Sequence, residues 1–116
     1  MSANNIEIVK AFYAAQGEKN IAGLEKYLHQ DVHFIMPLGE IKGKEAYLAN
    51  IKQHMNEFKT VSIRVLCGSG NHVMLAYDFD FGAPIGKCPT AALYTLNDGL
   101  ITHIELFFDA RPFVRS

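Results

Sequence analysis

Apolar residues recur at helical spacing in three stretches of the first half of the chain. The first stretch predicts a helix that starts at Asn4 or Asn5, either of which can cap it, and continues to Gln16. The second predicts a short helix over residues 21–28, and the third predicts a helix over residues 44–55. Their apolar positions are Ile6, Val9, Phe12, Tyr13, Leu24, Leu28, Tyr47, Leu48, Ile51 and Met55.

Alternating apolar and polar residues dominate the second half, which is typical of strands with one buried face. A short strand over residues 32–36 is expected between the second and third helices. After the third helix the alternation predicts further strands over residues 61–65, 73–81, 91–96 and 100–108.

The alternation within residues 73–81 decides which side chains point to the core. Asp78 and Asp80 share one face of this strand. The other face carries Val73, Leu75, Tyr77, Phe79 and Phe81. Turning the aspartates inward would bury two charges and expose the aromatic rings, so we expect the aromatic face to meet the helices.

The last two strands are expected to form a hairpin. Residues 97–99 predict a three-residue loop in which Gly99 adopts the positive φ, and this loop pairs Leu96 with Leu100. On that register the inner face carries Ala92, Tyr94 and Ile104. The outer face carries Leu93, Ile101, His103, Glu105 and Phe107.

Helices followed by strands indicate the α+β class. We expect three N-terminal helices packed on a curved, mainly antiparallel mixed sheet of five strands, which together form a cone with a cavity inside. Apolar residues also lie on the outer sheet face, and no element remains to cover them. The pattern therefore predicts a homodimer through the outer sheet face.

Composition narrows the class of protein. The 116 residues are enough for one domain, over residues 1–116, and 49% of them are hydrophobic. The net charge of -1 is atypical of disordered chains and of nucleic-acid binders. No apolar run is long enough for a membrane helix, and the start of the chain lacks the pattern of a signal peptide, so we expect a cytoplasmic protein that binds no membrane.

No motif in the chain indicates a cofactor or a metal. Cys67 and Cys88 do not form a CxxC pair, and the glycines of residues 82–89 do not have the spacing of a nucleotide-binding loop. His29 and His33 are four residues apart, but the expected change from helix to strand between them separates their rings. We therefore expect neither cofactor nor metal.

Three segments carry a resemblance to a known family. They are the YLHQDVHF stretch at residues 27–34, the GKEA stretch at residues 43–46, and the NDGLI stretch that begins at Asn97 and leads to Asp109. Their order and spacing resemble the nuclear-transport-factor-two-like superfamily, in its SnoaL-like and ketosteroid-isomerase-like branch, over nearly the whole chain. The resemblance implies the cone fold, a cystatin-like α+β roll, and functions that range from isomerase and cyclase to epoxide hydrolase.

The resemblance also implies where catalytic groups would lie. The carboxylate base of the ketosteroid isomerases falls on Met36, their protonated acid falls near Ala92, and their tyrosine falls on Phe12 or, with a slip of one residue, on Tyr13. Met36 and Ala92 cannot transfer protons, so this chain resembles the fold without that machinery.

An epoxide hydrolase of this superfamily would need an arginine and two carboxylates in the cavity. The available trio is Arg64, Asp78 and Asp80, which the alternation places on the outer face. This hydrolase role remains a further alternative. For Asp78 and Asp80 the structural interpretation is a solvated or interface face, with Arg64 close to Asp78.

The expected function is to bind a small, mostly apolar organic molecule in the cone, and to isomerise or cyclise it by proton transfer next to a carbonyl. Tyr13 or Tyr94 would hold the carbonyl oxygen, and Asp109 would be the base. The substrate would contact Phe34, Met36, Tyr77, Phe79, Ile104, Leu106 and Phe108. The alternative is a non-catalytic binding or assembly module, in which the tyrosines are core residues and Asp109 pairs with Arg111.

Overall fold

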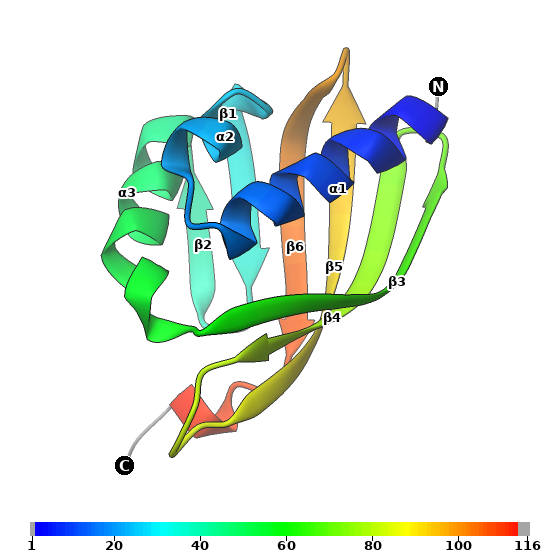
Figure 1. Cartoon of the computed structure of the whole chain (residues 1–116). Helices are drawn as coiled ribbons and strands as arrows, with labels where there is room; N and C mark the ends of the chain where they lie inside the picture. The colour runs from blue at the N-terminus through cyan, green and yellow to red at the C-terminus, as the bar shows by residue number, and fades with distance from the viewer. Residues whose placement is uncertain (1, 114–116) are drawn as a thin grey trace.

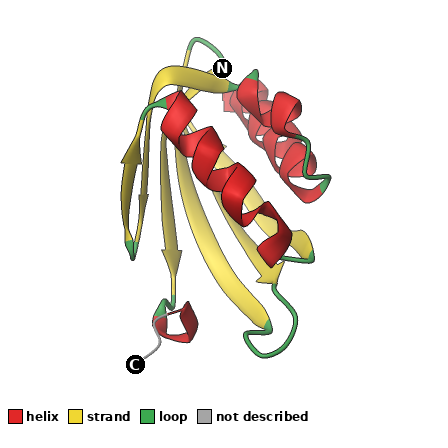
Figure 2. Ribbon diagram, turned by 90° about the vertical axis from the view of Figure 1, so that its left-hand side faces the viewer, coloured by secondary structure: helices red, strands yellow, loops and turns green. Residues whose placement is uncertain are grey.

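The structure is a computed structural model that describes residues 2–113, with side chains from Asn5 onward. Three helices cover one face of a curved six-stranded sheet (Figures 1 and 2). The helices are α1 (Ser2–Gly17), α2 (Ile21–Glu25) and α3 (Lys44–His54). The strands are β1 (Leu28–Met36), β2 (Gly39–Lys42), β3 (Thr60–Ser69), β4 (His72–Asp80), β5 (Lys87–Asn97) and β6 (Leu100–Phe108). Two short 3₁₀ turns, η1 (Met55–Glu57) and η2 (Arg111–Phe113), complete the described chain.

The strands lie in the order β2-β1-β6-β5-β4-β3. All neighbouring pairs are antiparallel except β1 and β6, which run parallel, so the sheet is mixed. The expected α+β class is confirmed. The expectation of five strands is wrong, because β2 adds a sixth after a tight turn in which Met36 pairs with Gly39. Four residues are too few for alternation to reveal a strand.

The helix boundaries differ from expectation at two points. α1 starts at Ser2, before Asn4 and Asn5, so neither residue caps it, and the side chain of Asn4 lies outside those described. Asn5 is inside the helix and its amide donates to the Gly70 carbonyl at 3.2 Å, which ties α1 to the β3–β4 turn. α2 ends at Glu25, earlier than expected, because Leu28 joins the sheet. None of the described helices has the length and apolarity required to span a membrane.

The β5–β6 hairpin has a shorter loop than the sequence predicts. Asn97 pairs with Leu100 across a two-residue loop of Asp98 and Gly99, whose φ angles of 53° and 80° are those of a type I′ turn. The predicted pairing of Leu96 with Leu100 is therefore wrong. The backbone twist of a two-residue type I′ turn matches the right-handed twist of the flanking strands better than that of a longer loop.

A β-bulge in β6 changes which side chains face the helices. Thr95 pairs with His103 but Leu96 pairs with Ile101, so Thr102 is the extra residue. The bulge turns Ile101 inward, where it is fully buried, although regular alternation places it on the outer face. The predicted outer position of Ile101 is wrong for this reason.

The predicted alternation along β4 is confirmed. Val73, Leu75 and Tyr77 are buried between the sheet and the helices. Asp78 lies on the opposite face, where its carboxylate accepts a hydrogen bond from Arg64 at 3.2 Å. This arrangement keeps both charges in contact with solvent and leaves the aromatic face for the core.

Aromatic rings from α1 fill the narrow half of the cone. The ring of Phe12 packs edge to face on Tyr94 with centroids 5.8 Å apart, and Tyr13 packs on Tyr77 at 4.8 Å. Edge-to-face packing of this kind stabilises a core beyond the burial of its apolar area. The hollow of the cone therefore begins only beyond these four rings.

No helix within residues 2–113 covers the outer sheet face (Figure 2). Its side chains include Met74, Leu93, His103, Glu105 and Phe107. Met74 and Phe107 are 41% and 46% exposed, which is high for large apolar side chains. Compared with the predicted face, Ile101 is lost and Met74 is added. Val65 also lies on this face, because it pairs with Ala76, and it is 60% exposed.

We predict that Gly99→Ala lowers the free energy of unfolding by about 1–2 kcal/mol, because an L side chain is strained at positive φ. A Cβ at Gly99 would meet only the Ile8 side chain, at an ordinary 3.9 Å, so the cost comes from the backbone alone. Gly17→Ala is the matched control, since it ends α1 with open space around it. Urea denaturation of both variants measures the difference, and equal stability would contradict the type I′ assignment.

Candidate functional site

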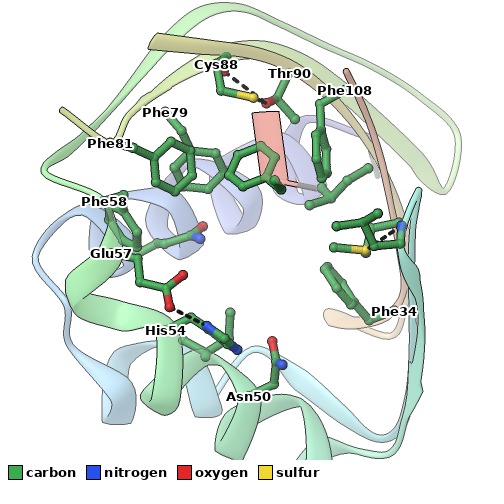
Figure 3. Close-up of a pocket in the computed structure, with 16 residues that line it drawn as sticks. Phe34, Asn50, His54, Glu57, Phe58, Phe79, Phe81, Cys88, Thr90 and Phe108 are labelled. Atoms are coloured by element: carbon green, nitrogen blue, oxygen red, sulfur yellow. Dashed lines mark hydrogen bonds and ion pairs between the residues drawn. The ribbon is translucent and has the colours of Figure 1, made fainter. Parts of the chain in front are cut away.

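A cavity of about 410 Å³ opens at the wide end of the cone (Figure 3). The ends of β1, β4 and β6 and the start of β5 form its sheet side, while the last turns of α3, with η1, form its helix side. η2 closes it from the C-terminal side with Phe113. This volume lies within the range of sites that bind small organic molecules.

Phenylalanine is the most frequent residue of the cavity wall. Six of the eight phenylalanines in the chain line it, namely Phe34, Phe58, Phe79, Phe81, Phe108 and Phe113. The rings support one another: Phe58 and Phe79 have centroids 5.2 Å apart, and so have Phe81 and Phe113. The wall is therefore apolar, and it presents ring faces and edges to any molecule inside.

Five residues predicted to contact a substrate line this cavity. They are Phe34, Met36, Phe79, Leu106 and Phe108. The other two, Tyr77 and Ile104, do not line it. Tyr77 precedes Phe79 on the inner face of β4 and contacts the Tyr13 ring of α1. Ile104 precedes Leu106 on the inner face of β6 and pairs with Tyr94, which lies among the same rings.

Tyr13 and Tyr94, the predicted oxygen-binding residues, also lie below the cavity. Both are almost fully buried, and neither is part of the cavity wall. Burial raises the pKa of Tyr13 well above its ordinary value, and the neighbouring phenols of Tyr77 and Tyr94 raise it further. Burial also raises the pKa of Tyr94. Both phenols therefore stay protonated at neutral pH.

Asp109, the predicted base, follows β6 and binds its neighbour Arg111. The Arg111 guanidinium donates to the Asp109 carboxylate at 2.6 Å, and the Arg111 backbone N–H donates to it at 3.0 Å. These hydrogen bonds lower the pKa of Asp109 to about 2. Asp109 is exposed and is not part of the cavity wall.

The trio considered for an epoxide hydrolase is outside the cavity too. Arg64 and Asp78 form their ion pair on the outer side of the sheet, and Asp80 accepts a hydrogen bond from the Gly82 backbone N–H at 2.9 Å. None of the three lines the cavity. Their positions follow from the alternation of β4, which turns Tyr77 and Phe79 inward.

A polar cluster of Asn50, His54 and Glu57, which sequence reasoning missed, lies on the helix side of the cavity. His54 Nδ1 is 2.8 Å from Glu57 Oε2 (Figure 3). Asn50 and His54 are four residues apart on α3 and therefore share one helix face. That spacing was visible in the sequence, but the direction of this face depends on how α3 packs on the sheet.

The remaining polar groups of the wall are Gln16, Cys88 and Thr90. The Thr90 hydroxyl donates to the Cys88 carbonyl at 3.1 Å. Burial raises the pKa of the Cys88 thiol, so the thiol stays protonated at neutral pH. Neither the Cys88 thiol nor the Thr90 hydroxyl is therefore suited to accept a proton from a ligand.

The two histidines of β1 form hydrogen bonds with nearby residues and do not line the cavity. His29 Nδ1 accepts a hydrogen bond from the Asp31 backbone N–H, and His33 Nε2 lies 2.5 Å from the Glu40 carboxylate. Among the residues with described side chains, no three His, Cys, Asp or Glu side chains gather closely enough to hold a metal ion.

We compared the chain with known protein families and with solved structures. The sequence profile of the SnoaL-like domain matches residues 9–104. No protein of curated function matches the chain. An NTF2-like protein of unknown function from Cytophaga hutchinsonii ATCC 33406 is similar, with 27% identity and a TM-score of 0.81 over 91% of this chain and 90% of that one.

Two further solved structures share the fold. A protein from Kribbella flavida DSM 17836, provisionally named a ketosteroid isomerase, is 13% identical with a TM-score of 0.85 over 99% of this chain and 90% of that one. TerC, crystallised with polyporic acid, is 21% identical with a TM-score of 0.82 over 95% of each chain. The fold is thus the NTF2-like α+β fold, and because the profile matches most of its length, the chain belongs to the SnoaL-like family.

Proposed function

We propose that this protein binds a small, mostly apolar organic molecule in the cavity at the wide end of the cone. The phenylalanine wall is the observation that carries the proposal, because it leaves apolar surface open to a ligand of suitable size. Burying such surface against a ligand is favourable, and flat rings would stack on or meet the edges of Phe79 and Phe108.

Binding without turnover is the form of this function that the contacts favour. Tyr13 and Tyr94 lie below the cavity, and Asp109 is bound to Arg111, so the residues expected to transfer protons do not line the wall. Isomerase or cyclase activity is the second candidate. The His54–Glu57 pair supports it, because an imidazole with a carboxylate neighbour can accept a proton at the cavity mouth.

We also propose that a second copy of the chain covers the outer sheet face. Exposed Met74 and Phe107 lie there among half-buried Leu93 and the polar His103 and Glu105. A patch with an apolar centre and polar surroundings is typical of subunit interfaces.

Leu106→Trp is expected to abolish ligand binding, because an indole ring would occupy the cavity. The measurement is the rise in melting temperature caused by steroids, terpenoids, fatty acids and polyporic acid, since a ligand that binds only the native state raises it. Leu48→Trp is the matched control: Leu48 is also partly buried, but it lines a separate hollow between α2 and α3. A ligand that stabilises the Leu106→Trp and wild-type proteins equally would refute binding in this cavity.

Arg111→Ala is expected to raise the pKa of Asp109 from about 2 toward the ordinary aspartate value, because the guanidinium that stabilises the carboxylate is removed. A lowered pKa favours the folded state above the ordinary aspartate pKa, and this contribution is lost as the pH falls toward 2. Titration of the Asp109 carboxyl carbon by NMR measures the change. An unchanged midpoint would show that Arg111 does not hold the carboxylate in solution.

Phe107→Glu is expected to convert a dimer into monomers, because it buries a charge in the interface. Light scattering of the wild type at micromolar concentration should give twice the chain mass of 12.9 kDa, and the variant should give the chain mass. Leu38→Glu is the control, since Leu38 is also exposed but lies at the cavity, away from the outer sheet face. A wild type of single-chain mass would overturn the dimer.

A further inference from the structure

Given the proposed binding function, on which this inference rests, we propose that Asn50, His54 and Glu57 form a recognition site for one acidic hydroxyl group of the ligand. The ligand class is then a phenol or an enol whose apolar body lies among the phenylalanine rings. We call these three residues the hydroxyl site.

The hydroxyl site is the part of the cavity wall where three polar side chains lie together, and the other polar lining residues are Gln16, Cys88 and Thr90. Figure 3 shows Asn50, His54 and Glu57 together on one side of the hollow, across from Cys88 and Thr90. The Thr90 hydroxyl is already engaged with the Cys88 carbonyl, and the Cys88 thiol is a weak hydrogen-bonding group. A ligand with one polar end therefore finds its best partners on the α3 side.

Glu57 determines which nitrogen of His54 is free. Its carboxylate is an acceptor, so in the neutral imidazole the proton resides on Nδ1 and is donated to Glu57 Oε2 over 2.8 Å. Nε2 then keeps its lone pair. A lone pair held in this way accepts a hydrogen bond from an O–H group, and the acidic O–H of a phenol or enol is a stronger donor than that of an alcohol.

Asn50 supplies the complementary group. Its side-chain amide lies one helical turn before His54 on the same face of α3 and also lines the cavity. An amide N–H donates to the hydroxyl oxygen while the hydroxyl proton is directed to Nε2. Together the two side chains satisfy both the donor and the acceptor of one hydroxyl group.

Charge argues against a carboxylate ligand at this position. Glu57 places a negative charge beside His54, and a second carboxylate there would be repelled. Lys19, a cation next to this wall, donates to the Phe58 carbonyl at 2.9 Å and lies over the face of the Phe58 ring. A neutral hydroxyl avoids this repulsion.

A purely structural role for the His54–Glu57 pair is the weaker explanation. The two side chains are 46% and 61% exposed, and ion pairs with such exposure contribute little to stability. A ligand in the cavity would shield the pair from water and strengthen its hydrogen bonds, so the pair has more effect on binding than on folding.

The test compares naphthol with its methyl ether, which has the same rings but no hydroxyl proton. The chain has no tryptophan, so naphthyl fluorescence reports binding to the wild type, to His54→Leu and to the control Gln53→Leu. Gln53 is the preceding residue of α3 and lines the hollow on the opposite side of that helix. Replacing either residue by leucine changes the polarity at similar size.

Wild type and Gln53→Leu are expected to bind naphthol about tenfold more tightly than the ether, the effect of one good hydrogen bond. His54→Leu should bind both probes equally, with the affinity of the wild type for the ether. Equal affinities in the wild type would overturn the hydroxyl site and leave the cavity as a ligand site. Binding of neither probe to the wild type would overturn the cavity proposal itself, and the hydroxyl site with it.

Glu57 acts through His54 and is a positioning residue. Glu57→Leu is expected to reduce the preference for naphthol, because the proton of His54 is no longer held on Nδ1. Glu57→Gln should retain it, since the amide carbonyl still accepts from Nδ1–H. Loss of the preference in both variants, or in neither, would overturn the positioning role.

Discussion

The packing of Phe12 and Tyr13 into the narrow half of the cone is the constraint on which the rest of the structure depends. Their rings contact Tyr94 and Tyr77, so side chains fill the space between α1 and the central strands. Rings packed at this density leave no room for a ligand among the tyrosines. The usable space is displaced to the wide end, where six phenylalanine rings contribute to the wall.

The regular alternation of apolar and polar residues along the strands predicts much of the cavity wall that the sheet forms. β4 keeps its period of two throughout, so the inward position of Phe79 follows from its sequence alone. Alternation fails where a strand contains an extra residue. Thr102 is such a residue in β6, and Arg64 is one in β3, between Ile63 and Val65. Neither bulge is visible in the hydrophobic pattern, so alternation places Ile101 on the wrong face. How deep the cone is filled depends on three-dimensional packing, and alternation alone does not determine it.

The helix side of the site was less predictable for a different reason. Periodicity identifies α3 and groups Asn50 with His54, but it does not say over which part of the sheet that face lies. At the positions where the resemblance expects proton-transfer groups, Met36 lines the cavity and Ala92 is fully buried. The polar cluster at the cavity therefore lies on α3 and η1, while the central strand β5 contributes Cys88 and Thr90.

The contribution of η2 to the cavity wall has a consequence for ligand selectivity. Phe113 reaches the wall from a single 3₁₀ turn that follows the last strand, and its ring contacts Phe81 and Phe108 but no backbone ladder holds it. A rotation of that turn would change the width of the cavity without changing the register of any strand. If the cavity binds a ligand as proposed, the position of the Phe113 ring, and not the shape of the sheet, would set how wide a molecule fits at this side.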